Sequence, residues 1–345
     1  MVQLVECIPN ISEGREKAAI DKIVNAIKSV NGVYVLDVYS DQDTNRTVIT
    51  FVGNIDGIFK ASFDCIKKAI ELIDMRFHNG IHPRIGAVDV FPIVPITGVS
   101  INKCIEVSHR LAKMVSDELD IPVYLYEKSA QFPQRVKLEN IRRGGYEKLA
   151  EKIIKPEWYP DYGKPVFVPK SGAIVMGVRE PLIAYNINLN TKDKRIADEI
   201  AGEIRESGNA INQLAEGNKR RPGLFKSVKA IGWYREELGI TQVSTNITDY
   251  RIAPLHKVYL EVERKAKEKG VELFGSEIVG LVPKEAIISA GLYFLGKSNE
   301  EKNSIQEKEI INAAVKGLCL NKWNMFKPEE KILEYKIEKI TGIKI

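Results

Sequence analysis

The order of predicted strands and helices repeats in the two halves of this chain, and the repeat restricts its fold more than any other feature. Each half places a strand, an amphipathic helix, two strands, a second helix and a final strand in the same succession. In the first half these elements fall at residues 4–8, 17–31, 33–38, 47–52, 55–73 and 87–94. In the second half they fall at residues 181–189, 192–206, 228–234, 241–250, 255–268 and 271–282. The succession β-α-β-β-α-β is that of a ferredoxin-like unit.

The matching halves predict an α/β (α+β) fold of two related ferredoxin-like subdomains, with mixed sheets and a ligand cleft between them. At 345 residues the chain exceeds one comfortable core, which agrees with two domains. We expect an N-terminal subdomain over residues 1–178 and a C-terminal subdomain over 179–300. Residues 301–345 carry a helical pattern with large apolar side chains, and we expect them to form an extension packed on the domains.

The connection between the halves has a different character. A helix at 102–119 and a short strand at 123–126 extend the first half. Residues 127–170 then contain many charges, the pair Gly144-Gly145 and several prolines, so we expect a connecting and binding region with little regular structure. A connection of that length favours a function of its own.

Composition excludes several classes of protein. With 44% hydrophobic and 28% charged residues the chain is typical of a globular protein, and its net charge of +5 comes from lysines and glutamates mixed along the sequence. We therefore expect no nucleic-acid partner. The sequence holds no apolar run of about 18 residues and no secretory signal, so we expect no membrane partner and a cytoplasmic location. Its four cysteines lack metal-ligand spacing, which indicates reduced thiols and no metal centre.

Residues 75–95 concentrate the groups most suited to chemistry. His78 and His82 have the i, i+4 spacing of two zinc ligands on a helix, but Gly80 and Pro83 disfavour a helix there. We expect a loop that presents His82, Arg84 and Asp89 at the entrance to a buried strand. The glycines of this loop would allow a close approach to ligand. The alternative is that both histidines are turn residues whose hydrogen bonds are satisfied by the backbone.

Two strands of the second half carry polar residues at every second position. Asparagines share one face of the first strand, and Gln242, Ser244, Asn246 and Thr248 share one face of the other. Asparagine is uncommon in strands, so we favour a cleft lining over a solvated face, with Asn188 and Asn246 as ligand contacts.

Several runs of sequence resemble one known family, the formiminotransferase domain of formiminotransferase-cyclodeaminase and its stand-alone relatives. The similarity covers nearly the whole chain, and many motifs in one order are more specific than any single motif. The runs are VECIPNISEG (5–14), NRTVITFVG (45–53), HNGIHPRIGAVDVFPIVP (78–95), EWYPDYG (157–163), LIAYNINLNT (182–191), IGWY (231–234), TQVSTNITDY (241–250) and GSEIVGLVP (275–283).

The resemblance implies a glutamate formiminotransferase. Such an enzyme transfers the formimino group of N-formimino-L-glutamate to N5 of tetrahydrofolate, its co-substrate, in histidine breakdown, with formyl exchange as a side activity. Family members form homodimers. The chain ends before any cyclodeaminase domain, so we expect a separate enzyme to take the formimino-folate onward.

The resemblance also implies the site. The histidine of the family's HPR motif is catalytic and falls on His82. The family's folate-binding segment falls on ten consecutive residues, Gly163, Lys164, Pro165, Val166, Phe167, Val168, Pro169, Lys170, Ser171 and Gly172. Arg84 would bind a substrate carboxylate or form a structural salt bridge, and Asp89 would stabilise the cationic formimino group or cap its strand. Tyr39 stands where mammalian members have an acidic partner for the histidine, and Asp41 or Asp43 would replace it.

Three further interpretations stay open. The basic run Lys219-Arg220-Arg221 would attract the glutamate tail of folate, or it forms a solvated loop. A folate-binding or carrier protein without turnover is the rival from another class. A metal-dependent hydrolase using His78, His82 and Asp89 is the third reading.

Overall fold

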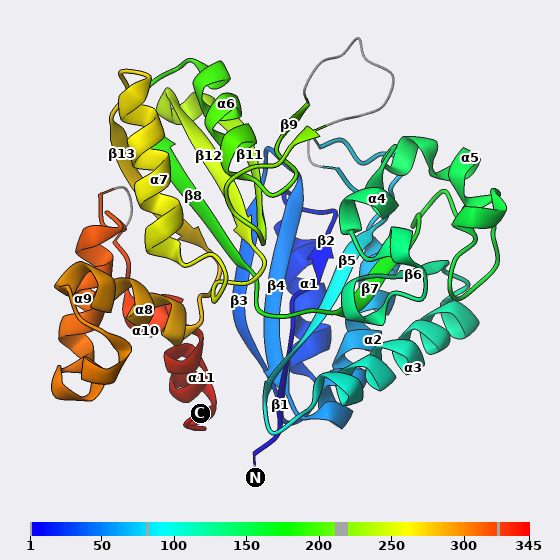
Figure 1. The fold of residues 1–345 in the computed structure, drawn as a ribbon. Helices are drawn as coiled ribbons and strands as arrows, with labels where there is room; N and C mark the ends of the chain where they lie inside the picture. The colour runs from blue at the N-terminus through cyan, green and yellow to red at the C-terminus, as the bar shows by residue number, and fades with distance from the viewer. Residues whose placement is uncertain (1, 81–82, 211–219, 323–324) are drawn as a thin grey trace. The chain divides into compact units, whose positions relative to one another are not determined.

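The structure is a computed structural model, and it describes residues 2–80, 83–210, 220–322 and 325–345. By its contacts the chain divides into two compact units, Met1–Glu180 and Pro181–Lys344. Each unit has its own sheet and its own hydrophobic core. The expectation of an α/β chain built from two units with separate sheets is confirmed (Figure 1).

The first unit contains one sheet of seven strands. Its elements in chain order are β1 (Leu4–Cys7), β2 (Asn10–Ile11), α1 (Lys17–Lys28), β3 (Val33–Asp41), β4 (Arg46–Gly53), α2 (Ile55–Leu72), β5 (Val88–Thr97), α3 (Ile101–Leu119), β6 (Val123–Leu125) and β7 (Ile174–Val178). Strand β1 lies between β4 and β5, and β3 pairs with the far side of β4, all antiparallel. This arrangement is the ferredoxin-like order that the first half of the sequence predicts. Strands β7 and β6 then extend the sheet in parallel beyond β5, which makes the sheet mixed.

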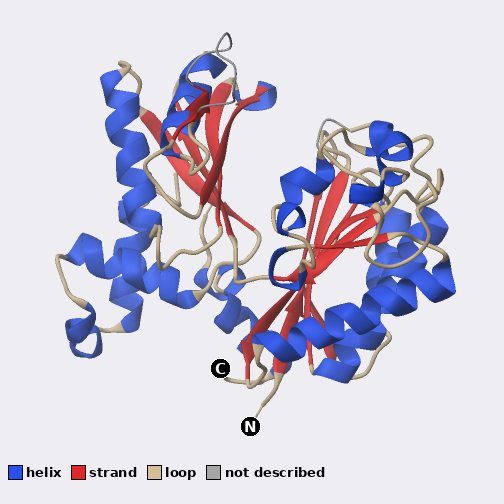
Figure 2. Cartoon of the chain, turned by 45° about the vertical axis from the view of Figure 1, so that its right-hand side comes forward, coloured by secondary structure: helices blue, strands red, loops and turns tan. Residues whose placement is uncertain are grey.

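Amphipathic helices build the core of the first unit. Helix α1 buries Ile20, Ile23, Val24 and Ile27, the one-sided spacing expected of a helix lying on a sheet. Asn54 caps α2 by accepting the amide of Gly57 at 2.8 Å. Helices α1, α2 and α3 cover the same face of the sheet and share one hydrophobic cluster with its strands (Figure 2).

The region from 127 to 172 has more regular structure than expected. It contains helices α4 (Leu138–Arg142) and α5 (Leu149–Ile153) and several turns of 3₁₀ helix. The prediction of little regular structure is therefore wrong, because short helices of five residues leave no periodic pattern to read. These helices bury Ile141, Leu149 and Ile153 against Val90 and Val175. They therefore cover the face of β5 and β7 that lies opposite α1, α2 and α3. Strands buried on both faces are usual where pairing is parallel.

The EWYPDYG motif fixes this region to the sheet through one buried ion pair. Arg135 and Asp161 pair at 2.8 Å with 2% and 0% of their side chains exposed. Asp161 also accepts the amide of Leu125 at 2.7 Å, and Arg135 donates to the carbonyl oxygen of Tyr159 at 2.6 Å. These contacts join the motif to β6 and to the turn at 133–135, so the motif serves the packing of the unit.

The second unit has a four-stranded sheet in the order β11-β12-β8-β13. Its elements are β8 (Ile183–Leu189), α6 (Lys194–Ile204), β9 (Asn209–Ala210), β10 (Arg220–Arg221), β11 (Val228–Arg235), β12 (Ile240–Ile247), α7 (Leu255–Glu268) and β13 (Leu273–Val279). The order is again ferredoxin-like, but all pairings in this sheet are antiparallel, so the expected mixed pairing applies to the first sheet alone.

In the described part of the chain after β13, the α-helices are α8 (Lys284–Leu295), α9 (Glu307–Gly317), α10 (Pro328–Lys331) and α11 (Leu333–Thr341). Helix α8 has no counterpart in the sequence predictions because it is apolar around most of its circumference and shows little amphipathic period. It packs against α9, and a bridge joins Val282 to Ile332. Leu318, Leu320 and Phe326 are buried in the same cluster.

Candidate active site

The loop between α2 and β5 is anchored at both ends on the last residues of segment 163–172. The amide of Met75 donates to the carbonyl oxygen of Lys170 at 2.8 Å. At the other end, the amide of Ala87 donates to Ser171 at 2.8 Å, and that of Ala173 donates to Ile85 at 3.1 Å. The structure therefore brings together the histidine-bearing loop and the segment at 163–172, which lies about 80 residues later in the sequence.

Two glycines of the loop are required by close backbone contacts. A Cβ atom on Gly80 would lie 2.4 Å from the carbonyl oxygen of Thr44, and one on Gly86 would lie 2.2 Å from that of Ala173. Any other residue would force the backbone apart at these points. The close approach that we expected toward a ligand is, in the structure, an approach to neighbouring backbone.

His82 lies outside the described residues, so its assignment as the catalytic group stays a prediction. Its neighbour His78 is held by two partners. Nε of Arg84 donates to Nδ1 of His78 at 3.0 Å, and Nε2 of His78 lies 3.0 Å from the carbonyl oxygen of Asn45. Only the neutral tautomer with its proton on Nε2 satisfies both contacts. Burial is the main cause that lowers the pKa of His78, and the Arg84 charge adds to it.

Arg84 joins the loop to the short helices that follow. Its Nη1 atom pairs with Oε1 of Glu147 at 2.8 Å, with 13% of the arginine side chain and 61% of the glutamate side chain exposed. The pair has one anchored member and one solvated member, so it contributes little stability of its own. Arg84 is thus a cation held in place by His78, with a partner that can leave at small cost.

Asp89 is buried at the start of β5 and pairs with Arg142, at the end of α4. Its Oδ1 atom accepts the amide of Ile85 at 3.1 Å and Nε of Arg142 at 3.2 Å. These contacts fix the base of the loop. Its assignment as a catalytic group stays a prediction. Arg142 carries no signal in the sequence, because its partner is 53 residues away.

Two more groups surround this pair. Arg46, the first residue of β4, is half-buried and donates to Oδ1 of Asn10. Burial lowers the pKa of Arg46 to about 10, and the charge of Arg142 adds to the effect. Lys152 donates to the carbonyl oxygens of Asn140 and Ile141 at 2.9 and 2.7 Å, which stabilises the end of α4 where a cation is favoured. Arg46 is therefore a second cation beside the pair of Asp89 and Arg142.

The remaining predicted residues are spread more widely. Within segment 163–172, Lys164 and Val166 are exposed while Ser171 is buried. Asn188 and Asn246 belong to the second unit, where Asn188 on β8 is fully buried and Asn246 on β12 is exposed. Of the basic run, Arg220 and Arg221 form β10, and Lys219 lies outside the described residues. Asp41 accepts the amide of Thr44 at 2.9 Å within the turn after β3.

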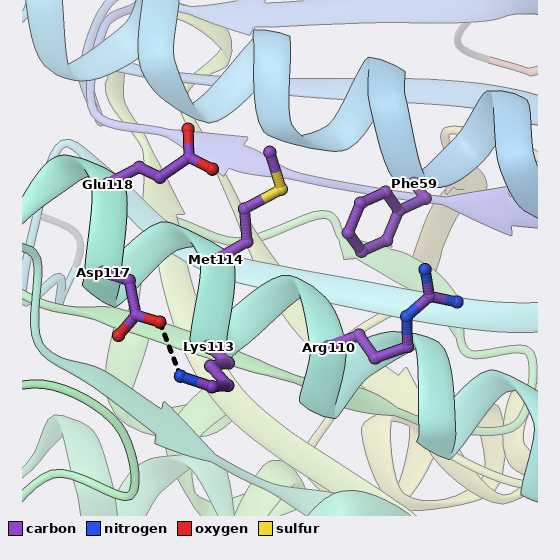
Figure 3. A pocket seen from close by; sticks show the side chains of 6 residues that line it. All are labelled: Phe59, Arg110, Lys113, Met114, Asp117 and Glu118. Carbon is purple, nitrogen blue, oxygen red and sulfur yellow. Dashed lines mark hydrogen bonds and ion pairs between the residues drawn. The ribbon is translucent and has the colours of Figure 1, made fainter.

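A shallow groove on the helical face of the first unit has none of these residues in its lining (Figure 3). It lies between α2 and α3, where Arg110 stacks on Phe59 with 4.9 Å from its Cζ atom to the ring centroid. Lys113 and Asp117 form an exposed ion pair at 2.6 Å along its edge. We assign this groove no part in the candidate site.

No cluster of three or more His, Cys, Asp or Glu side chains suited to a metal ion occurs among the residues with assigned positions. Both nitrogens of His78 are already engaged, which leaves no lone pair for a metal and argues against the hydrolase reading. Within the part of the chain that the structure covers, no helix is long and apolar enough to cross a membrane. The four cysteines are free thiols.

Fold and site together define a chain of two ferredoxin-like units whose first unit holds a His- and Arg-bearing loop anchored on a later segment. The formiminotransferase domain, N-terminal subdomain, matches residues 4–179, and the formiminotransferase domain matches residues 184–338. The chain belongs to the formiminotransferase family.

Individual relatives are similar along most of the chain. The glutamate formimidoyltransferase of Thermoplasma acidophilum is 41% identical, covering 91% of this chain and 99% of that protein. The protein of the same name from Streptococcus pyogenes is also 41% identical, over 86% and 94% of the two chains. The formimidoyltransferase-cyclodeaminase of Gallus gallus is 44% identical over 98% of this chain, which spans 60% of that longer relative.

Proposed function

We propose that this protein is a glutamate formimidoyltransferase, which transfers the formimino group of N-formimino-L-glutamate to N5 of tetrahydrofolate. The observation that carries the proposal is the anchoring of both ends of the loop at 75–87 on residues 170–173. Ala87 and Ser171 belong to the two runs of sequence that resemble the family's HPR motif and folate segment, so their contact supports the proposal. The similarity to two relatives of that name over most of their length supports it.

The reaction requires one proton to move while one bond replaces another. The lone pair of N5 attacks the formimino carbon and forms a tetrahedral adduct. The bond from that carbon to the glutamate nitrogen then breaks, and glutamate leaves as an amine that has gained the proton lost by N5. His82 is the proposed carrier of this proton, because an imidazole titrates near neutral pH.

Arg84 is the proposed binding group for a carboxylate of the donor. Its side chain is already held by His78, so binding a substrate requires only that Glu147 exchange places with it. Glu147 and the glutamate part of the donor both end in a carboxylate. The donor carboxylate can therefore replace that of Glu147 as the partner of Arg84. Asp89 would act on the cationic formimino group or, through Arg142, on the position of the loop.

Folate binding is proposed for residues 163–172, Asn188 and Asn246. Lys164 is exposed and offers a solvated cation for the glutamate tail of folate. At the other end of the segment, Ser171 is buried, so the backbone there is held in a fixed position. Formyl exchange as a side activity, a homodimer, a cytoplasmic location and a separate downstream cyclodeaminase stay predictions.

Turnover is the direct test. Purified protein, tetrahydrofolate and N-formiminoglutamate should yield formimino-tetrahydrofolate, followed by absorbance, with tetrahydrofolate alone as the blank. Tight folate binding without any product would contradict the proposal and favour a carrier. Loss of N-formiminoglutamate that yields no formimino-tetrahydrofolate, stops with chelator and returns with zinc would favour the hydrolase class instead.

A further inference from the structure

The face of the second sheet that points away from α6 and α7 carries a connected set of amide and carboxylate groups. Ile183, Tyr185, Ile187 and Leu189 of β8 pack with those helices, so the alternate residues of β8 face the other way. On that face, Gln242 donates from Nε2 to Oδ1 of Asn188 at 2.8 Å and to Oε1 of Glu277 at 2.9 Å. Asn186 donates to the same Oε1 atom at 3.2 Å.

The network leaves one buried donor without a partner. Asn188 and Gln242 are 0% and 2% exposed, yet Nδ2 of Asn188 makes no hydrogen bond with any residue that the structure describes. The orientation of this amide is determined by its neighbours. A carboxylate only accepts, so Gln242 must turn its NH₂ group toward Glu277, and Asn188 must then turn its oxygen toward Gln242. An unpaired buried N–H is energetically unfavourable, so it indicates a missing acceptor.

A carboxylate beside an unpaired amide donor matches one edge of a pterin. The 2-amino group and N3–H of a 2-amino-4-oxo-pteridine are two adjacent donors, and O4 beside them is an acceptor. We propose that the carboxylate of Glu277 accepts from the 2-amino group and N3–H of the folate pterin, while Nδ2 of Asn188 donates to O4. This inference rests on the proposed function, since it names the subsite in which that function would hold its co-substrate.

Two other observations agree with this placement. Both amides that bind Glu277 donate to Oε1, and they hold the carboxylate in a fixed position before any ligand arrives. Trp233 stands opposite Gln242 in the pairing of β11 with β12, so its indole lies on the same face of the sheet. A flat aromatic side chain next to the polar groups suits a planar heterocycle.

Calorimetric titration of the full chain tests the assignment with three ligands. These are 5-formyltetrahydrofolate, its counterpart in which a methyl group replaces the 2-amino group, and p-aminobenzoylglutamate, which lacks the pterin. The parent should bind the amino form about ten- to a hundredfold more tightly than the methyl form, the range for a hydrogen bond to a charged group. Glu277→Gln should remove most of this preference and leave binding of p-aminobenzoylglutamate unchanged.

The matched control is Glu272→Gln, the same chemical change at an exposed residue just before β13, and it should keep the parental preference. If Glu277→Gln fails to fold, Asn188→Ala offers a second route, because it should weaken 5-formyltetrahydrofolate by about tenfold and spare the fragment. If the parent binds and turns over folate, and both variants keep its full affinity and its preference for the amino form, this inference is wrong while the proposed function stands. If the parent neither binds reduced folate nor turns it over, the proposed function itself is wrong.

Discussion

Nε of Arg84 lies 3.0 Å from Nδ1 of His78, and the arginine can donate there only while that ring nitrogen is unprotonated. The pKa of His78 is lowered, chiefly by burial. In the unfolded chain the ring would protonate near pH 6.5, whereas in the fold it stays neutral to a lower pH. The stabilisation from this contact is therefore complete above pH 6.5 and is lost as the pH falls through the folded pKa.

We expect nuclear magnetic resonance to find the His78 ring titrating below pH 6.5. The resonance is assigned by comparison with His78→Gln. A titration midpoint at or above pH 6.5 would mean that the ring does not accept from Arg84 in solution.

Replacing His82 should separate catalysis from binding. If His82 carries the proton, His82→Ala should lower kcat by about 10² to 10⁴ while folate affinity and the melting temperature stay near the parental values. His78→Ala should have a smaller effect, because His78 positions Arg84. His109→Ala is a suitable control, since His109 lies on α3 and contacts Tyr162 at 3.0 Å. Parental kcat in His82→Ala, or complete loss in His78→Ala alone, would show that the wrong histidine has been chosen.

The buried pair of Asp89 and Arg142 should be essential for stability. Asp89→Asn leaves Arg142 with an unpaired charge that is only 13% exposed, so we expect the free energy of unfolding to fall by about 3 to 5 kcal/mol. The same change in the exposed pair, Asp117→Asn, should alter it by less than about 0.5 kcal/mol. Urea denaturation measures both. Equal midpoints for the two variants would indicate that Asp89 contributes to function and little to the fold.

His256 should make the second unit sensitive to acid. The residue is 5% exposed, its ring stacks on Tyr293 at 4.4 Å, and burial lowers its pKa to about 4. Since the unfolded ring protonates near pH 6.5, stability is present above that pH and decreases between pH 6.5 and 4, by on the order of 2 to 3 kcal/mol. Melting curves recorded from pH 7 to 4 should show a smaller decrease in His256→Phe. An identical decrease in parent and variant would exclude this residue as the cause.

The two asparagines proposed for folate should respond differently to the same substitution. Asn188→Leu removes a buried partner of Gln242, so both stability and folate affinity should fall. Asn246→Leu changes an exposed position and should lower affinity alone. Fluorescence titration with a folate analogue, at a temperature where both variants are folded, measures the difference. Parental affinity in both would show that neither residue contacts the ligand.

Local patterns predicted the fold well where they are long and periodic. Helix α7 occurs at the predicted residues 255–268, because its apolar positions recur over four turns. Strand β7 was missed. Its sequence IVMGV is a short apolar run after a proline-rich segment, and its pairing partners β5 and β6 are fixed by tertiary contacts.

The candidate site was predictable only in part, for a related reason. His78, Arg84 and Asp89 lie close together in the sequence and attract attention as a group. Arg142 and Asn45 contact them from 53 and 33 residues away, and nothing in their own surroundings marks them. A single sequence records which side chains are available, whereas long-range pairing decides which of them meet.

The hydrogen bonds from Met75 to Lys170 and from Ala87 to Ser171 also bear on when the loop can form. The strands and helices of the β-α-β-β-α-β unit are complete at Thr97, and the loop inside it already has Asn45 as a partner of His78 and Ser12 as a partner of Gly86. Its backbone contacts with residues 170–173 are missing until that later segment is present. Contacts of such large sequence separation form late, because a long stretch of chain must first be ordered. During synthesis, the four antiparallel strands β1, β3, β4 and β5 would therefore be available well before the loop gains these last contacts.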